Sequence, residues 1–130
     1  MTALELLNIA AQASQEAYAP YSKFHVGAAL LTENGAVFTG CNVENASYGL
    51  TLCAERVAIF KAISAGVRSF QAIAISVPGG GSPCGACRQV MNEFNPHLPI
   101  ILGDPTGKIM SETTLDILLP AAFGPENLSA

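Results

Sequence analysis

Charged residues are scarce in this sequence. Asp, Glu, Lys and Arg make up 12% of the 130 residues, whereas hydrophobic residues make up 50%. The six Lys and Arg form no basic run, and the ten Asp and Glu give the chain a net charge of −4. Nonspecific nucleic-acid binding needs clustered basic side chains that neutralise phosphates, so we expect no nucleic acid polymer as a partner. Such an apolar small protein is expected to cover part of its hydrophobic surface with other subunits.

Long hydrophobic runs are also absent. Every apolar stretch is interrupted well before the roughly 20 residues that a transmembrane helix needs, so we expect no membrane partner. Residues 1–5 lack the basic start and continuous apolar core of a signal peptide, which favours a cytoplasmic protein. The length is typical of one domain, and we expect residues 1–130 to form a single domain without internal repeats.

The sequence contains alternating helical and strand patterns. Helices are expected over residues 2–18, 52–65, 82–94 and 114–118, and strands over residues 25–32, 36–41, 70–77, 98–103 and 108–111. The pair Asn34-Gly35 is a strong hairpin signal between the first two strands. The later strand–helix–strand segments are compatible with parallel pairing, so the order of elements predicts an α/β fold with a mixed sheet.

Two of the four cysteines, Cys84 and Cys87, lie three residues apart at the expected start of a helix. Residues at this spacing share a helix face, so both sulfur atoms can reach one ion. The partial positive charge of a helix N-terminus favours the thiolate form, which binds Zn²⁺. An isolated Cys-x-x-Cys pair is equally compatible with a redox function.

A third cysteine, Cys53, opens another expected helix together with Glu55. If the two helix N-termini converge, three thiolates surround one zinc ion and leave its fourth position open, as in catalytic zinc sites. Glu55 then lies beside the open position and can act as acid and base. The alternative is a closed structural site with Cys41 as the fourth ligand, in which Glu55 would have no role.

This arrangement matches the zinc-deaminase signature H-x-E followed by P-C-x-x-C, with Cys53 in the position of the histidine. Three thiolates bound to one Zn²⁺ ion give the site a net charge of −1. We expect Arg56, next to Glu55, to donate hydrogen bonds to ligand sulfur atoms and to offset that charge.

Over nearly its whole length, the chain resembles the small, zinc-dependent, homotetrameric cytidine deaminases. The matching segments are residues 19–24 (APYSKF), 26–30 (VGAAL), 40–48 (GCNVENASY), 53–56 (CAER), 82–89 (SPCGACRQ) and 118–125 (LLPAAFGP). The resemblance implies a five-stranded mixed sheet between helix layers and one Zn²⁺ per subunit. It also implies a tetramer whose active sites lie at subunit contacts.

The implied reaction is hydrolytic deamination of cytidine and deoxycytidine to uridine and deoxyuridine, with release of ammonia, as in pyrimidine salvage. Glu55 would transfer protons, and Cys53, Cys84 and Cys87 would bind zinc. The resemblance assigns substrate contacts to Phe24 (base ring), Asn42 and Glu44 (ribose 3′-hydroxyl), Ala54 and Ser82 (backbone contacts to the base), Tyr48 (lent by a neighbouring subunit) and Phe123 (closing the pocket). An amide and a carboxylate two residues apart on one strand end are suited to a sugar diol.

Two alternative functions differ from this interpretation. One is a deaminase for another aminated ring, such as blasticidin S or free cytosine. Neither offers Glu44 a normal ribose, so its charge would be left unsatisfied. The other is a noncatalytic zinc-binding module in which the metal only supports the fold.

Overall fold

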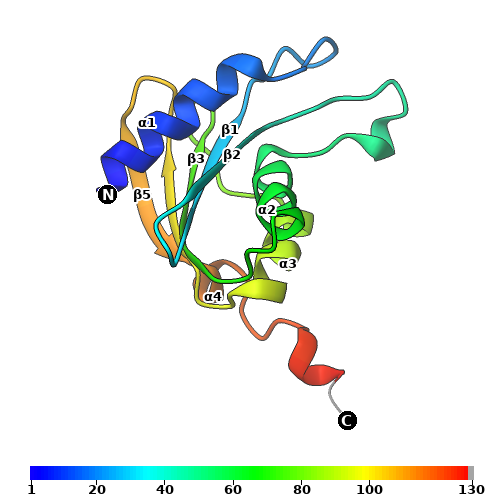
Figure 1. Ribbon diagram of the computed structural model, residues 1–130. Helices are drawn as coiled ribbons and strands as arrows, with labels where there is room; N and C mark the ends of the chain where they lie inside the picture. The colour runs from blue at the N-terminus through cyan, green and yellow to red at the C-terminus, as the bar shows by residue number, and fades with distance from the viewer. Residues whose placement is uncertain (129–130) are drawn as a thin grey trace.

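The computed structural model describes residues 1–128, and a five-stranded sheet lies at its centre (Figure 1). The strand order across the sheet is β2-β1-β3-β4-β5. The strands are β1 (Gly27–Thr32), β2 (Val37–Cys41), β3 (Phe70–Ser76), β4 (Pro99–Gly103) and β5 (Ile109–Thr114). β3 and β4 pair in parallel and the other neighbours pair antiparallel, which confirms the expected mixed sheet.

Helices cover both faces of this sheet (Figure 1). Helix α1 (Ala3–Ala13) packs on one face, and α2 (Ala54–Ser64) and α3 (Gly85–Phe94) pack on the other. A short helix, α4 (Leu115–Leu118), follows β5. This confirms the α/β fold with a five-stranded mixed sheet between helix layers. Within residues 1–128, the helices are too short or too polar to cross a membrane.

Strand β3 contributes to the core on both faces of the sheet. Ile73 and Ile75 pack in the cluster under α2 and α3, whereas Ala74 packs in the cluster under α1. All three side chains are buried. Successive residues of a strand point to opposite faces, so a continuous apolar run is what a strand covered on both sides requires.

The segment after α1 differs from the expectation of a helix over residues 2–18. Thr2 caps the helix as expected, since its side chain accepts a hydrogen bond from Glu5 N, but α1 ends at Ala13. Beyond a short 3₁₀ turn, Tyr18 N donates to Asn42 O (2.9 Å) and Glu44 N donates to Tyr18 O (2.8 Å). These contacts hold the chain extended against a distant segment, so tertiary hydrogen bonding ends the helix early.

Two other expected boundaries are wrong. The helix expected from Ser82 begins at Gly85, with Cys84 as its N-cap, because the Arg88 guanidinium holds the preceding Ser82–Pro83 segment. Strand β5 continues to Thr114, three residues beyond its expected end at residue 111, and it takes in Thr114, the first residue of the helix expected over residues 114–118. Its side chains are exposed or half-buried on an edge strand, where ladder pairing with β4 tolerates polar residues.

Candidate active site

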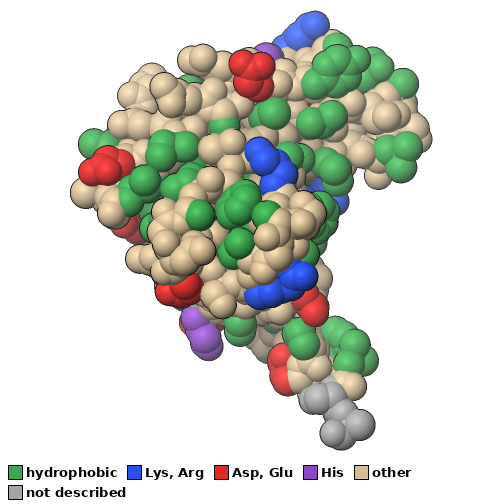
Figure 2. Space-filling view, viewed as in Figure 1, with side chains coloured by type: hydrophobic (Ala, Val, Ile, Leu, Met, Phe, Trp, Pro, Cys, Tyr) green, Lys and Arg blue, Asp and Glu red, His purple; other side chains and the backbone are tan. Residues whose placement is uncertain are grey.

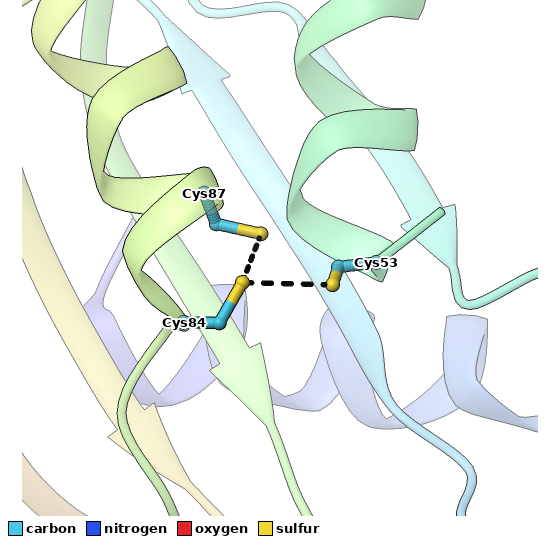
Figure 3. A group of neighbouring side chains, drawn as sticks. All are labelled: Cys53, Cys84 and Cys87. Carbon is cyan, nitrogen blue, oxygen red and sulfur yellow. Dashed lines mark hydrogen bonds between the residues drawn. The ribbon is translucent and has the colours of Figure 1, made fainter. Parts of the chain in front are cut away.

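The three cysteines expected to bind metal converge at the N-termini of two helices (Figure 3). Cys53 is the N-cap of α2, Cys84 is the N-cap of α3, and Cys87 lies in the first turn of α3. The Cys53 and Cys84 sulfur atoms are 3.8 Å apart, and those of Cys84 and Cys87 are 3.4 Å apart. The helix starts carry partial positive charge, which stabilises thiolates at this point.

This donor set fits zinc. With Zn–S bonds of about 2.3 Å, tetrahedral geometry separates ligand sulfur atoms by roughly 3.8 Å. The three sulfur atoms lie within 4.8 Å of one another. Among residues 1–128, Cys53, Cys84 and Cys87 are the His, Cys, Asp or Glu side chains that form this group. Cys41 lies outside the group, at the end of β2, where it pairs with Gly27. A closed four-cysteine site therefore has no support from this geometry.

The charges around the sulfur atoms favour a thiolate at Cys53. Its pKa is lowered to about 5, because the Cys87 thiol donates a hydrogen bond to it and the Arg56 guanidinium lies nearby. The pKa of Cys87 is raised, because its proton is shared with Cys53 and the residue is buried. A divalent cation would supply the positive charge that the remaining thiols need in order to ionise.

Arg56 reaches the metal cluster from α2. Its Nη2 lies 3.5 Å from Cys53 Sγ and 3.5 Å from the Thr51 carbonyl oxygen. The hydrogen bond to Cys53 raises the pKa of the guanidinium, which keeps it fully charged. Its Nε is buried without an acceptor among residues 1–128. The side chain is thus directed toward the Cys53 sulfur atom.

Glu55 is a buried carboxyl group, with only 4% of its surface exposed. Burial raises its pKa, and the neighbouring Cys53 charge raises it further. A carboxyl group with a raised pKa keeps its proton to a higher pH than a free carboxylic acid does, and general acid–base catalysis requires a group that can both take up and release a proton.

A cavity of about 400 Å³ opens beside Glu55 and Cys53. Its walls come from four segments, within residues 22–26, 42–44, 51–55 and 77–82. Besides Cys53 and Glu55, the residues expected from the sequence that line it are Phe24, Asn42, Glu44, Ala54 and Ser82. The volume suits a small molecule, and the cavity combines apolar walls with a few polar groups, as ligand pockets commonly do.

The Asn42 side chain organises one wall of this cavity. Its Nδ2 donates to the Phe24 carbonyl oxygen (2.7 Å), and its Oδ1 accepts from Val26 N (2.9 Å). Each end of the amide keeps one further hydrogen-bonding position, because an amide has two N–H groups and two lone pairs. Asn42 therefore holds the segment that carries Phe24 and retains the capacity to bind a hydroxyl group.

Glu44 is half-buried, and its carboxylate is ionised at neutral pH. Its Oε1 accepts from the backbone N–H groups of Tyr21 (3.0 Å) and Ser22 (3.2 Å), and its Oε2 accepts from the Ser22 hydroxyl. These bonds, chiefly that from the Ser22 hydroxyl, lower the pKa of Glu44.

Two residues expected at the pocket lie outside this cavity of their own chain. Tyr48 is 78% exposed and its ring packs edge-on against Tyr21, with centroids 6.2 Å apart. Phe123 is 59% exposed, and its carbonyl oxygen accepts from Gln89 Nε2 (2.8 Å) and Asn92 Nδ2 (3.3 Å) of α3. Hydrophobic side chains gather on the projecting loop before α2 and on the C-terminal tail (Figure 2).

Sequence reasoning assigned no function to two residues that hold the site together. Ser22 lines the cavity, and its hydroxyl accepts a hydrogen bond from Phe24 N. The sequence could have indicated this contact, because a serine often accepts a hydrogen bond from the backbone N–H two residues further along the chain. Arg88 donates to Pro83 O (2.8 Å), Ser82 Oγ (2.9 Å) and Leu118 O (2.7 Å). No local pattern indicates the last contact, which spans 30 residues.

Comparisons with known proteins agree with this geometry. The family model described as the cytidine and deoxycytidylate deaminase zinc-binding region matches residues 1–102. A cytidine deaminase of Sporosarcina psychrophila is 55% identical over 121 residues, which cover 91% of this chain and 88% of the relative. One from Halalkalibacterium halodurans is 51% identical over 131 residues, covering 95% and 96% of the two chains.

The fold is similar to that of solved structures in the same group. The crystal structure of cytidine deaminase from Burkholderia pseudomallei superposes with a TM-score of 0.90 at 52% identity, covering 95% of this chain and 100% of the other. The matched region includes the zinc-binding group Cys53, Cys84 and Cys87. On this evidence of sequence, fold and metal-binding residues, the chain belongs to the cytidine deaminase family.

Proposed function

We propose that this protein catalyses the hydrolytic deamination of cytidine and deoxycytidine to uridine and deoxyuridine, with release of ammonia. The observation that carries the proposal is the position of Glu55, buried on the wall of a nucleoside-sized cavity beside the sulfur cluster. The names of the similar proteins, all cytidine deaminases, support the same substrate.

Cys53, Cys84 and Cys87 would hold one zinc ion. When bound, zinc supplies the Lewis acidity that makes a water molecule nucleophilic near neutral pH. Arg56 is proposed to offset the charge of the thiolates, through its hydrogen bond to Cys53 Sγ.

Glu55 is proposed to carry the protons. Its carboxylate oxygen removes a proton from the attacking water and delivers it to N3 of the ring as the bond from oxygen to C4 forms. It then transfers the remaining hydroxyl proton to the amino group, so that the C4–N bond breaks and ammonia leaves. The raised pKa of Glu55 suits both transfers.

The other cavity residues would orient the nucleoside. Phe24 packs on the base, and Asn42 and Glu44 bind the ribose 3′-hydroxyl. Ala54 begins α2, where the first backbone N–H groups lack partners within the helix and are available to the base. The Ser82 carbonyl is proposed to accept a hydrogen bond from the base.

The proposal includes a homotetramer with active sites at subunit contacts, in which Tyr48 is lent to a neighbouring subunit's pocket and Phe123 closes a pocket. Support comes from the exposure of both rings in the single chain. Residues 1–130 are proposed to act as one catalytic domain. The four free cysteines favour the cytoplasm, where thiols stay reduced.

The decisive experiment mixes the purified protein with cytidine and follows the ultraviolet spectrum as uridine forms, with and without a chelator. Glu55→Gln is expected to abolish turnover while zinc content and sedimentation stay unchanged. Glu112→Gln, an exposed substitution on β5, is the matched control and should retain full activity. Parent-like turnover by Glu55→Gln would overturn the mechanism, and no turnover by the parent protein would overturn the function.

A further inference from the structure

Ser22 lies in a turn that packs against the cavity. The turn is closed by a hydrogen bond from Lys23 N to Ala19 O (3.0 Å), and Lys23 adopts a φ of 60°, a conformation uncommon for a residue other than glycine. Tyr18, at its start, is tied to Asn42 and Glu44 through backbone hydrogen bonds. The turn is therefore attached at its base, and the conformation of its tip needs other contacts.

The Ser22 hydroxyl supplies two such contacts. Its oxygen accepts from Phe24 N (3.0 Å), and its proton is donated to Glu44 Oε2. One hydroxyl thus links the backbone of the proposed base contact to the carboxylate of the proposed ribose contact. The Asn42 side chain donates a hydrogen bond to the Phe24 carbonyl oxygen. The N–H and the carbonyl of Phe24 are therefore both held by side chains of the cavity wall, those of Ser22 and Asn42.

We propose that Ser22 is a positioning residue for substrate binding, whose hydroxyl fixes Glu44 and Phe24 together in the arrangement that receives the nucleoside. This inference rests on the proposed function. Without the hydroxyl, Glu44 keeps two backbone donors but loses the one that orients Oε2, and Phe24 N loses its acceptor. Binding would then have to order both groups, which weakens affinity.

The charge on Glu44 provides a readout specific to this role. The Ser22 hydroxyl is the main cause of the lowered Glu44 pKa, and His25 is the neighbouring charged group that adds to the effect. Tyr21 and Ser22 contribute their backbone N–H groups. Removing the hydroxyl should therefore raise the pKa of Glu44, so that protonation weakens ribose binding at a higher pH than in the parent protein.

The first test compares Ser22→Ala with Ser22→Thr, which keeps a hydroxyl, and with Ser69→Ala. Ser69 is an exposed serine that precedes β3, at the end of that strand away from the cavity. We expect Ser22→Ala to raise the KM for cytidine and the inhibition constant of uridine by about tenfold, with kcat within about twofold. Ser22→Thr should recover most of the loss, and Ser69→Ala should match the parent protein.

The second test asks whether Ser22 acts through Glu44. The KM of Ser22→Ala should begin to rise at a higher pH on the acid side than that of the parent protein. The effects of Ser22→Ala and Glu44→Gln on KM should be less than additive, because both remove the same contact. The loss should also be smaller with 2′,3′-dideoxycytidine, which lacks the 3′-hydroxyl that Glu44 is proposed to bind.

An unchanged KM in Ser22→Ala, or additive effects with Glu44→Gln, would overturn the inference while the parent protein still deaminates cytidine. Failure of the parent protein to deaminate cytidine would instead overturn the proposed function. The melting temperature of each variant is measured to detect misfolding. If Ser22 had a purely structural role, Ser22→Ala would lower the melting temperature but would not change the pH at which KM begins to rise on the acid side.

Discussion

Gly40 lies directly against the backbone of Ala54. A Cβ atom at Gly40 would stand 2.4 Å from the Ala54 carbonyl oxygen and 2.5 Å from Ala58 N, closer than nonbonded atoms approach. The missing side chain lets α2 rest on β2 at the turn that follows Cys53. A strand glycine therefore sets the position of one metal-binding residue.

Gly40→Ala should push α2 away from the sheet, because the added methyl group meets backbone atoms that cannot rotate aside. We expect a loss of about 2–3 kcal/mol in the free energy of unfolding and weaker zinc retention. Thermal unfolding and zinc stoichiometry measure the two effects. Gly49→Ala, where a Cβ would meet no atom within 4 Å, is the control and should change neither. Equal behaviour of the two variants would refute this account of α2.

The two cysteines Cys41 and Cys53 should respond differently to substitution by serine. Cys53→Ser removes one of three sulfur ligands, so we expect less than one zinc per chain and a loss of activity of at least about a hundredfold. Cys41 lies outside the cluster, so Cys41→Ser should retain both the bound zinc and the activity. Metal analysis and cytidine turnover report the results. Zinc loss in Cys41→Ser would revive the closed four-cysteine site.

Removing the metal from the parent protein should also lower its stability. Zinc binds the folded arrangement of three sulfur atoms, which the unfolded chain does not hold, so binding shifts the equilibrium toward the folded state. We expect the melting temperature to fall after chelation and to recover when zinc is added back. Magnesium should give no recovery, because it prefers oxygen ligands. Recovery with magnesium would contradict a thiolate site.

Part of the metal cluster could be predicted from the sequence because that part is local. The spacing of Cys84 and Cys87 puts both on one helix face, and the sequence places two helix starts near Cys53 and Cys84, at residues 52 and 82 instead of the observed 54 and 85. That the two helix starts meet depends on contacts between segments 31 residues apart. The bonding of Glu44 could not be predicted, since its partner Ser22 lies 22 residues away. The early end of α1 has the same cause, because the contact between Tyr18 and Asn42 joins distant segments.

Arg88 should resist replacement by lysine. Its guanidinium bonds three acceptors, among them Pro83 O and Leu118 O, and a lysine ammonium lacks the planar fork that reaches them together. We expect Arg88→Lys to destabilise the fold by about 1–3 kcal/mol and to raise the KM for cytidine. Arg68→Lys is the matched control, since Arg68 bonds Ile63 O and Val67 O, just after α2 and away from the cavity. Equal effects on KM would contradict a role near Ser82.

Glu44 should make the stability of the turn at residues 19–24 depend on pH. Its pKa in the folded protein is lowered, chiefly by the Ser22 hydroxyl, so its contribution is present above the ordinary pKa of a glutamate. The contribution is lost as the pH falls through the folded pKa, where the carboxylate becomes protonated.

We therefore expect Glu44→Gln to show a smaller drop in melting temperature between neutral and acidic pH than the parent protein. The difference should be small, because the carboxylate is exposed and screened by solvent. The charge of His25 also lowers the pKa of Glu44, so His25→Gln is measured in parallel to separate the two groups. Glu112→Gln, exposed on β5, should keep the parent's pH dependence. A parental acid response in Glu44→Gln would mean that the Ser22 contact does not hold Glu44 in its ionised form.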